Sequence, residues 1–333
     1  MPKVSVILNC YRQADYVREA VDSALSQTFR DFELIAIDNG SPDETPAILA
    51  TYQSDPRVRL FLHRDNRTIS SRFNEGVRAA TGEFVCFLYS DDFYLPHKLE
   101  TQLRLFEGPA AGCGVVYAPL RTKNQRTGET WTNPAFAIED DTLLSLLKMS
   151  DVSQVDMISP LSRRECFVRH PFQDDVFAEG EGIFLRVALT HRFHYDASPV
   201  AVMRDTGENR GRAIRVNVEM HERTLSALES DPAFRPDRYA AALRSYRARL
   251  LRNSGFSLLR VGGDVQWARE AIKRSISLSP RDALHPRTVI GLGLSALPGG
   301  LRDRVNALGH RLRGVKVGTS SLGGYGGSSG QGS

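Results

Sequence analysis

The stretch VSVILNCYRQADYVREAVDSALSQTFRDFELIAIDNGSPDET, residues 4–45, carries the pattern that predicts the fold. Residues 4–8 form a largely apolar run, as expected of a strand buried on both faces of a sheet. From Asp15, a candidate N-cap, apolar residues recur at helical spacing. Residues 32–37 form a second apolar run, and the turn at 40–45 opens another helix. This order predicts an α/β fold.

The same alternation continues to about residue 100. The pattern predicts a third strand at 58–62, a helix at 69–80 and a fourth strand at 83–88. We therefore expect a Rossmann-like, mostly parallel sheet with helices on both faces. In such sheets, ligands bind beside the carboxyl ends of the strands.

Polar clusters stand at three of these carboxyl ends. They are NCYR (9–12), DNGS (38–41) and YSDD (89–92). Because parallel strands end at the same edge of a sheet, we expect the clusters to converge. In FLYSDDFYLP (87–96), Asp91 and Asp92 end an apolar run. Burial of two adjacent carboxylates is costly, so this position predicts a cation or a hydrogen-bond donor beside them.

The composition indicates a globular protein of two or three folding units. The chain has 333 residues, of which 41% are hydrophobic and 25% are charged, and this is enough for a sizeable core. Four cysteines without a CxxC pair predict reduced core residues in a cytoplasmic protein. The N-terminus lacks a secretory pattern, and no apolar run reaches the ~20 residues that span a bilayer.

Charge is distributed unevenly along the chain. Residues 1–230 carry 26 Lys+Arg against 33 Asp+Glu, whereas residues 231–333 carry 17 against 6. An apolar segment broken by Gly and Pro, 288–301, lies in the basic part, which has a helical pattern from about residue 210. This combination suits peripheral contact with anionic lipid at the inner face of the plasma membrane. A helical cap with a solvated basic face remains an equal alternative.

Nucleic acid is not an expected partner. The basic excess is confined to the helical C-terminal part and lacks an aromatic-interleaved motif. The last 17 residues, 317–333, have no charge and almost no apolar content. We expect them to be disordered.

Two long stretches resemble the inverting glycosyltransferases of family 2, which have the GT-A fold. The first is residues 4–45, and the second is NRTISSRFNEGVRAATGEFVCFLYSDDFYLPHKL, residues 66–99. A third stretch, EGEGIFLRVAL at 179–189, resembles the family more weakly. The motifs occur in the family's order and spacing.

The resemblance implies a nucleotide-diphospho-sugar transferase domain at residues 1–210. Its nucleotide-binding half would be 1–100 and its acceptor half 101–210. A basic helical region at 211–316 and the tail would follow. The implied activity is transfer of a sugar from a nucleoside-diphosphate donor to an acceptor hydroxyl with inversion. A glycan or lipid-linked acceptor would place the protein in cell-envelope or extracellular glycan synthesis.

The resemblance also implies which residues bind the donor. Asp38 would accept hydrogen bonds from the base or ribose, and Tyr11 with its neighbours would flank the base. Asp38 also fits an ordinary acid at a strand-end turn, and Arg204 fits a surface arginine. The implied donor-binding residues are Asn9, Tyr11, Asp38, Arg72 and Arg204.

The family's Asp-x-Asp motif falls on Tyr89-Ser90-Asp91, so its first acid is missing. The resemblance implies that Asp91 binds Mg²⁺ or Mn²⁺, with diphosphate oxygens completing the coordination. Asp92 would either orient Asp91 or cap the helix that begins near Pro96. A turn and N-cap without a metal is the alternative.

The catalytic base is implied at the start of the third stretch. Inverting transfer needs a carboxylate that accepts the acceptor's proton. Glu179 falls on the family's Glu, Gly180 on its Asp, and Glu181 lies one step later. Either glutamate suits the role. Two solvated acids that complement a helix dipole are the alternative.

Two other functions remain open. A catalytically inactive nucleotide-binding or scaffold protein on the same fold would explain Tyr89, Gly180 and Thr206 at motif positions. A nucleotidyltransferase should carry a glycine-rich, basic phosphate loop near its start. The stretch NCYRQADY, residues 9–16, does not have that composition.

Overall fold

The computed structural model forms two compact units, residues 1–145 with 154–207 and residues 146–153 with 208–333. The catalytic candidates Glu179 and Glu181 and the predicted tail at 317–333 lie outside the described residues. The structure describes residues 1–133, 135–138, 141–148, 155–174, 176, 180, 182–206, 214–261 and 263–313, with side chains to residue 306 in the last range.

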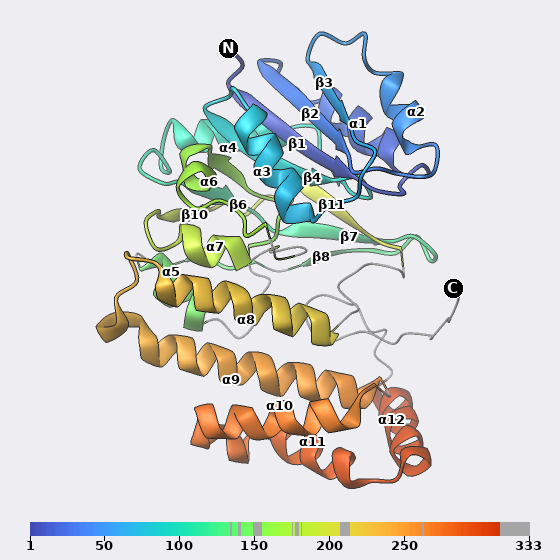
Figure 1. The fold of residues 1–333 in the computed structure, drawn as a ribbon, viewed down its shortest axis with the longest axis vertical. Coiled ribbons are helices and arrows are strands. Elements are labelled where there is room, and N and C mark those ends of the chain that lie inside the picture. The colour runs from blue at the N-terminus through green and yellow to red at the C-terminus, as the bar shows by residue number, and fades with distance from the viewer. Residues whose placement is uncertain are drawn as a thin grey trace. The chain divides into compact units, whose positions relative to one another are not determined.

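The first unit is built on a seven-stranded sheet in the order β10-β6-β9-β4-β1-β2-β3 (Figure 1). Only β9 among these strands is antiparallel to its neighbours, so the predicted α/β fold with a mostly parallel sheet is confirmed. The strands are β1 (Val4–Cys10), β2 (Phe32–Asp38), β3 (Val58–Leu62), β4 (Phe84–Tyr89), β6 (Val115–Tyr117), β9 (Leu161–Arg163) and β10 (Phe193–Tyr195).

Helices cover both faces of this sheet. Val4, Val6 and Leu8 of β1 share one core with α1, α2 and α4. On the other face, α3 approaches β1 closely, because a Cβ on Gly76 would lie 2.4 Å from Ile7 Cγ2. Figure 1 shows α3 in front of the sheet. These helices are α1 (Val17–Leu25), α2 (Thr45–Ala50), α3 (Ile69–Ala79), α4 (Lys98–Phe106) and α6 (Glu165–Arg169).

Helix starts only partly follow the sequence signals. The N-cap of α1 is Tyr16, without a side-chain cap, so the prediction of Asp15 as N-cap is wrong. At α3, the Thr68 hydroxyl accepts a hydrogen bond from Ser71 N, which is an ordinary N-cap. The apolar run 114–120 is divided between β6 and β7, which belong to different sheets.

A smaller sheet, in the order β5-β11-β7-β8, stands in the same unit. Strand β5 directly follows the Asp91-Asp92 pair and is antiparallel to β11. This pairing brings Arg204 of β11 close to both aspartates. The strands are β5 (Phe93–Tyr94), β7 (Leu120–Asn124), β8 (Thr130–Asn133) and β11 (Ala201–Asp205), and the unit also contains α7 (Gly182–Val187).

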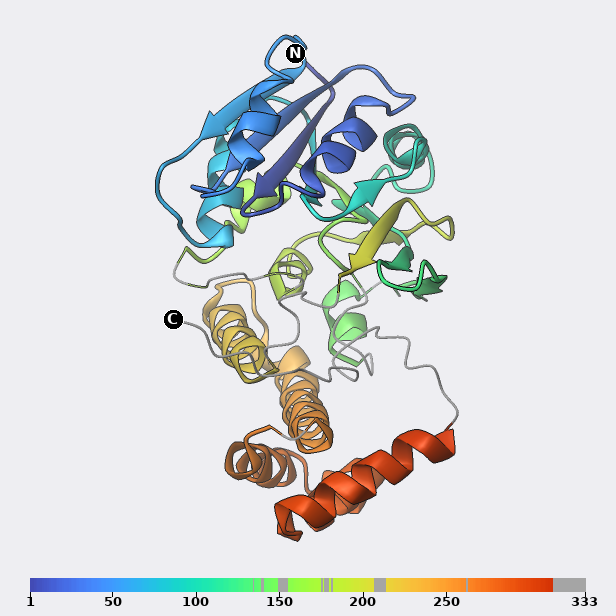
Figure 2. The same cartoon turned by 90° about the vertical axis from the view of Figure 1, so that its right-hand side faces the viewer.

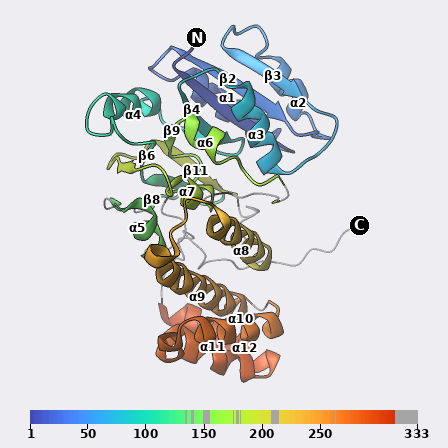
Figure 3. The ribbon, with the colours of Figure 1, turned by 60° about the vertical axis from the view of Figure 1, so that its left-hand side comes forward.

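The second unit is helical, as predicted from about residue 210 (Figures 2 and 3). Leu259, Ala268, Ile272 and Leu294 form its buried core. In the described part of the chain, no helix is long and apolar enough to cross a bilayer. The elements are α8 (Ile214–Ser230), α9 (Pro236–Arg260), α10 (Val265–Leu278), the 3₁₀ helix η2 (Pro280–Leu284), α11 (Pro286–Ala296) and α12 (Gly299–Arg313), while α5 (Thr142–Lys148) spans the division between units.

A lysine side chain is buried in the first unit. Lys98 Nζ donates to Gln102 Oε1 at 2.8 Å and to Ser159 O at 2.5 Å. It also lies 4.9 Å from the centroid of the Tyr94 ring. Burial lowers the pKa of Lys98 to about 8, because the charged form loses its hydration.

Replacement of Lys98 by methionine is expected to change how stability depends on pH. Between pH 8 and the ordinary lysine value, the unfolded chain binds a proton that the folded chain has lost, so the wild type gains stability as the pH rises. Relative to Lys98→Met, this gain should reach about 3 kcal/mol. Urea unfolding of both proteins from pH 7 to 10 measures it. Parallel pH profiles for the two proteins would contradict the expected charge burial.

Candidate active site

The polar clusters converge at one edge of the large sheet. Strand β1 lies between β2 and β4, with Cys10 opposite Asp38 and Asn9 opposite Tyr89. All three strands are parallel and therefore end at the same edge. This confirms the predicted convergence.

Asp38 lies at this edge, and one of its two carboxylate oxygens accepts hydrogen bonds from the backbone. Its side chain is 1% exposed, and Oδ2 accepts hydrogen bonds from Gly40 N at 3.2 Å and Ser41 N at 3.0 Å. Oδ1 of Asp38 and Oδ1 of Asn9 are buried and have no hydrogen-bond partner among the described residues. A buried acceptor without a donor costs about 1–3 kcal/mol. Both positions therefore favour a ligand that donates hydrogen bonds.

The loop after β1 is tied to the loop after β2. Arg12 has φ of +56°, and half-buried Tyr11 lies beside it in the first loop. Burial raises the pKa of Asp43, but hydrogen bonds from Thr45 and Ala14 outweigh this and lower it below its ordinary value. The backbone N–H groups of the first loop donate to side chains of the second: Arg12 to Ser41, Gln13 to Thr45 and Ala14 to Asp43.

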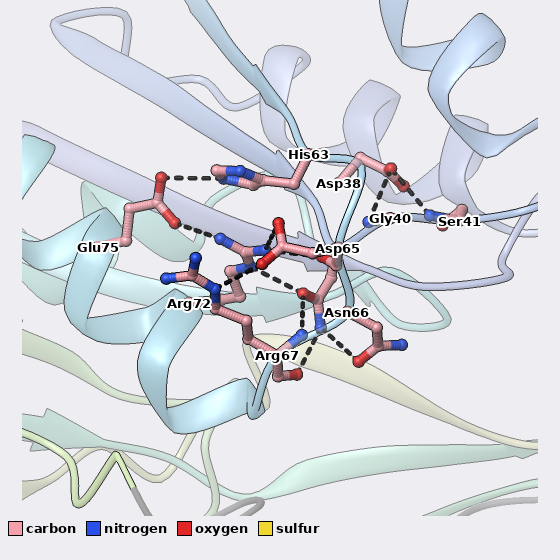
Figure 4. Close-up of polar contacts among 10 residues, drawn as sticks. Asp38, Gly40, Ser41, His63, Asp65, Asn66, Arg67, Arg72 and Glu75 are labelled. Atoms are coloured by element: carbon pink, nitrogen blue, oxygen red, sulfur yellow. Dashed lines mark hydrogen bonds and ion pairs between the residues drawn. The ribbon is translucent and has the colours of Figure 1, made fainter.

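Arg72 lies under the loop that follows β3 (Figure 4). Its guanidinium is 2% exposed and donates to Asn39 Oδ1 at 2.7 Å, Asp65 O at 2.8 Å and Glu75 Oε2 at 3.0 Å. Asn39 in turn accepts from Arg67 N at 2.9 Å. Arg72 therefore joins the loop after β2 to the loop after β3. The donor-binding role that the resemblance implies for Arg72 stays a prediction.

This network supports the backbone next to Asp38. Gly40 has φ of +75°, and a Cβ there would lie 2.8 Å from the Asp65 carbonyl carbon. The turn therefore needs glycine both for its conformation and for its close approach to the neighbouring loop. His63 Nε2 lies 2.9 Å from Glu75 Oε1 and closes the far side of the network.

The Asp92 side chain is hydrogen-bonded to β11 of the smaller sheet. Its Oδ1 accepts from Arg204 N at 2.8 Å. The N-cap of α4 is His97, without a side-chain cap, so the suggestion that Asp92 caps this helix is wrong. Burial and the charge of Asp91 raise the pKa of Asp92 well above its ordinary value, although the Arg204 N–H opposes them. A cation beside the pair would relieve this repulsion.

The Arg204 side chain is buried next to the same pair. Its Nε donates to Asp91 O at 2.9 Å, and its Nη2 lies 2.5 Å from Glu19 Oε2. The guanidinium also lies 4.8 Å from the Phe93 ring centroid and 5.4 Å from that of Tyr16. Arg204 is thus not a surface arginine, and it fixes the backbone of Asp91. The donor-binding role that the resemblance implies for Arg204 stays a prediction.

Negative charge gathers around the carboxyl end of β1. Burial raises the pKa of the Cys10 thiol, a hydrogen bond with Ser90 opposes this, and the charges of Asp38, Asp91 and Asp43 raise it further. Among the described residues, no group of three His, Cys, Asp or Glu side chains is arranged to hold a metal. Mg²⁺ and Mn²⁺ sites that use one or two carboxylates plus substrate phosphates fit this donor set.

Two contributors were missed by the sequence reasoning. Asn39 was noted only within the polar cluster at 38–41, and no role was predicted for Glu19. The Asn-Gly pair at 39–40 was the available signal, because Gly40 permits the approach of Asp65. No local pattern indicated that Asn39 and Glu19 bind arginines distant in sequence.

Comparison with known proteins gives a family match over residues 5–155, to the model "Glycosyl transferase family 2". An uncharacterized glycosyltransferase of Rickettsia prowazekii is 38% identical over 126 residues, which are 38% of this chain and 39% of that protein. One from Haemophilus influenzae is 38% identical over 104 residues, 31% of this chain and 42% of that protein. The chain thus matches about two fifths of the length of these relatives.

Solved structures share the fold over most of the chain. S. aureus TarS 1–349 in complex with UDP-GlcNAc has a TM-score of 0.64 at 15% identity, covering 93% of this chain and 92% of that one. A mannosyltransferase from Pyrobaculum calidifontis in complex with GDP-Man and Mn²⁺ has a TM-score of 0.58 at 18% identity, covering 92% and 87%. At such identities the likeness shows the fold alone.

Proposed function

Residues 5–155 belong to glycosyl transferase family 2, and from this premise we propose that the protein transfers a sugar from a nucleoside-diphosphate donor to an acceptor hydroxyl with inversion. The observation that carries the proposal is the convergence of Asp38 and Asp91 at the carboxyl ends of strands on either side of β1. Asp38 is suited to bind the nucleoside, and Asp91 is suited to bind a cation on the diphosphate. Cell-envelope or extracellular glycan synthesis is the proposed setting.

The donor would bind with its base or ribose against Asp38. The unpartnered Oδ1 of this carboxylate accepts one hydrogen bond, while the two loop N–H groups keep the other oxygen in place. Asn9 offers a second buried acceptor. Tyr11, in the loop tied to Ser41 through Arg12, would flank the base. The structural neighbours that hold UDP-GlcNAc and GDP-Man support a nucleotide-sugar donor.

Asp91, with Asp92 behind it, would hold Mg²⁺ or Mn²⁺. Bound there, the cation would neutralise charge on the departing diphosphate. The mannosyltransferase solved with Mn²⁺ supports this cofactor. Arg204 would hold the Asp91 backbone in position through its bond to the carbonyl oxygen. Proton removal from the acceptor is assigned to Glu179 or Glu181 on the resemblance alone.

The first test is calorimetric titration with UDP, GDP and dTDP, with and without Mn²⁺. Asp38→Asn should weaken binding of the preferred nucleotide about 10- to 100-fold, because a hydrogen bond to a charged group contributes about 1.5–3 kcal/mol. Asp31→Asn is a matched control, since exposed Asp31 directly precedes the same strand at its other end. Equal affinities for wild type and Asp38→Asn would exclude Asp38 from the donor site.

A catalytically inactive nucleotide-binding or scaffold protein is the second candidate. Tyr89, where the family motif has its first acid, favours it, because one carboxylate is then lost from the cation site. Such a protein would bind nucleotide without releasing it from a nucleotide sugar. Assays of donor hydrolysis and transfer therefore separate the two candidates.

A further inference from the structure

The last helices of the second unit expose apolar side chains. Leu284 of η2 is 87% exposed, and Val289 and Ile290 of α11 are 56% and 52% exposed. Gly293, one turn further on, has open space around its Cα. Helical spacing places Val289, Ile290 and Gly293 along one side of α11, and Leu284 ends the preceding η2. The buried residues of α11 are Thr288, Gly291, Leu294 and Ser295.

The buried side is what holds α11 in the unit. A Cβ on Gly291 would lie 2.7 Å from Ile272 Cδ1, so α11 packs closely on α10. Arg269 of α10 also donates to the Ser295 carbonyl oxygen. Val289 and Ile290 take no part in this packing. Both side chains are therefore open to a partner outside the unit.

The segment that carries these apolar residues has a positive net charge. Residues 280–313 contain six arginines and two aspartates, a net charge of +4. Arg281 and Arg287 are both exposed. Asp282, between them, is 14% exposed and pairs with Arg252 at 2.9 Å. The nearest acid is thus already neutralised from inside the unit.

Helix α12 repeats the combination. Leu301 and Val305, one turn apart, are 48% and 43% exposed, and Arg304 beside them is also exposed. Asn306 Nδ2 donates to Leu259 O at 3.0 Å and fixes the helix to α9. Apolar side chains among arginines, on helices too short to span a bilayer, are typical of helices that lie in a membrane interface.

We propose that the η2–α11 surface, defined as Arg281 and Leu284 of η2 with Arg287, Val289 and Ile290 of α11, docks on the anionic surface of a lipid bilayer. The apolar side chains would enter the boundary between headgroups and acyl chains, and the arginines would bind lipid phosphates. The inference deepens the proposed function, on which it rests for its biological role. Docking would hold the transferase beside a lipid-linked acceptor.

Flotation of the full chain with phosphatidylcholine vesicles, with and without phosphatidylglycerol, tests the proposal. Binding is expected only with the anionic lipid, and added salt should weaken it. Arg281→Gln with Arg287→Gln should lower the partition coefficient about fivefold per arginine. Val289→Ser with Ile290→Ser should lower it as well. Arg104→Gln and Val168→Ser make the same changes at exposed positions of the first unit and should leave it unchanged.

Failure of the protein to bind anionic vesicles would overturn the proposal, and so would equal losses in the control variants. Sedimentation of the same samples tests the alternative that a second copy of this chain binds the surface. Self-association that is lost in Val289→Ser/Ile290→Ser, without vesicle binding, would make the η2–α11 surface an interface between two copies. Nucleotide titration on these samples keeps the two proposals apart, because docking can fail while donor binding persists.

Discussion

Replacement of Asp91 by asparagine is expected to lower the rate of sugar transfer by about 10²- to 10³-fold and to abolish any enhancement of nucleotide binding by Mn²⁺. The magnitude is that of losing one group that stabilises charge in a transition state. Asparagine keeps the size of the side chain and the backbone carbonyl that Arg204 binds. The substitution removes the carboxylate charge that Asp91 would offer to a cation.

The measurement is titration of wild type and Asp91→Asn with the preferred nucleotide, with and without Mn²⁺, followed by transfer kinetics. Asp92→Asn is the neighbouring comparison. Its Oδ1 binds Arg204 N, so asparagine can still accept that bond. The Mn²⁺ effect should therefore persist in Asp92→Asn. If Asp91→Asn retained the full Mn²⁺ effect, the cation would have to be bound elsewhere.

Replacement of Arg72 by methionine is expected to destabilise the first unit by about 1.5–3 kcal/mol, because the Asn39 side chain and the Asp65 carbonyl oxygen would lose the hydrogen bonds that the buried guanidinium donates to them. The turn at Gly40 would then lose its support, and nucleotide affinity should fall too. Denaturant unfolding and nucleotide titration measure the two effects.

Arg67→Met is the matched control for Arg72→Met. Arg67 lies in the loop that Arg72 binds, and its side chain is 62% exposed and 2.6 Å from Asp65 Oδ2. An exposed pair of this kind contributes about 0–1 kcal/mol. Equal destabilisation by the two substitutions would mean that burial of Arg72 has no special role. Arg72→Lys should recover little, because lysine lacks the planar set of donors that reaches three partners.

The sequence predicts the parts of the fold that depend on local periodicity. Strand β3 coincides with the predicted 58–62, because a short apolar run bounded by turns is itself the signal. The apolar run 114–120 also has the pattern of a strand, but its two ends pair with different strands far along the chain. Strand pairing is a nonlocal interaction, so the sequence of the run itself does not indicate its partners.

The candidate site shows the same division. The converging strand ends could be predicted, because parallel order alone determines where they lie. The role of Arg72 could not, because its bond to Asn39 joins positions 33 residues apart. The resemblance implied that Arg72 binds the donor, whereas its described bonds run to two loops and to Glu75. For Asp38, the sequence left open both an acid at a strand-end turn and a donor-binding residue. The structure is compatible with both, because Oδ2 accepts a hydrogen bond from the turn while the buried Oδ1 has no partner among the described residues.

The four buried cysteines can be used to detect local opening of the first unit. Cys10, Cys86, Cys113 and Cys166 are free, and all lie in the first unit. Burial raises the pKa of each thiol, which slows reaction of the closed state with alkylating reagents. Alkylation monitored by mass spectrometry would therefore time the opening of the first unit, without a signal from the helical one.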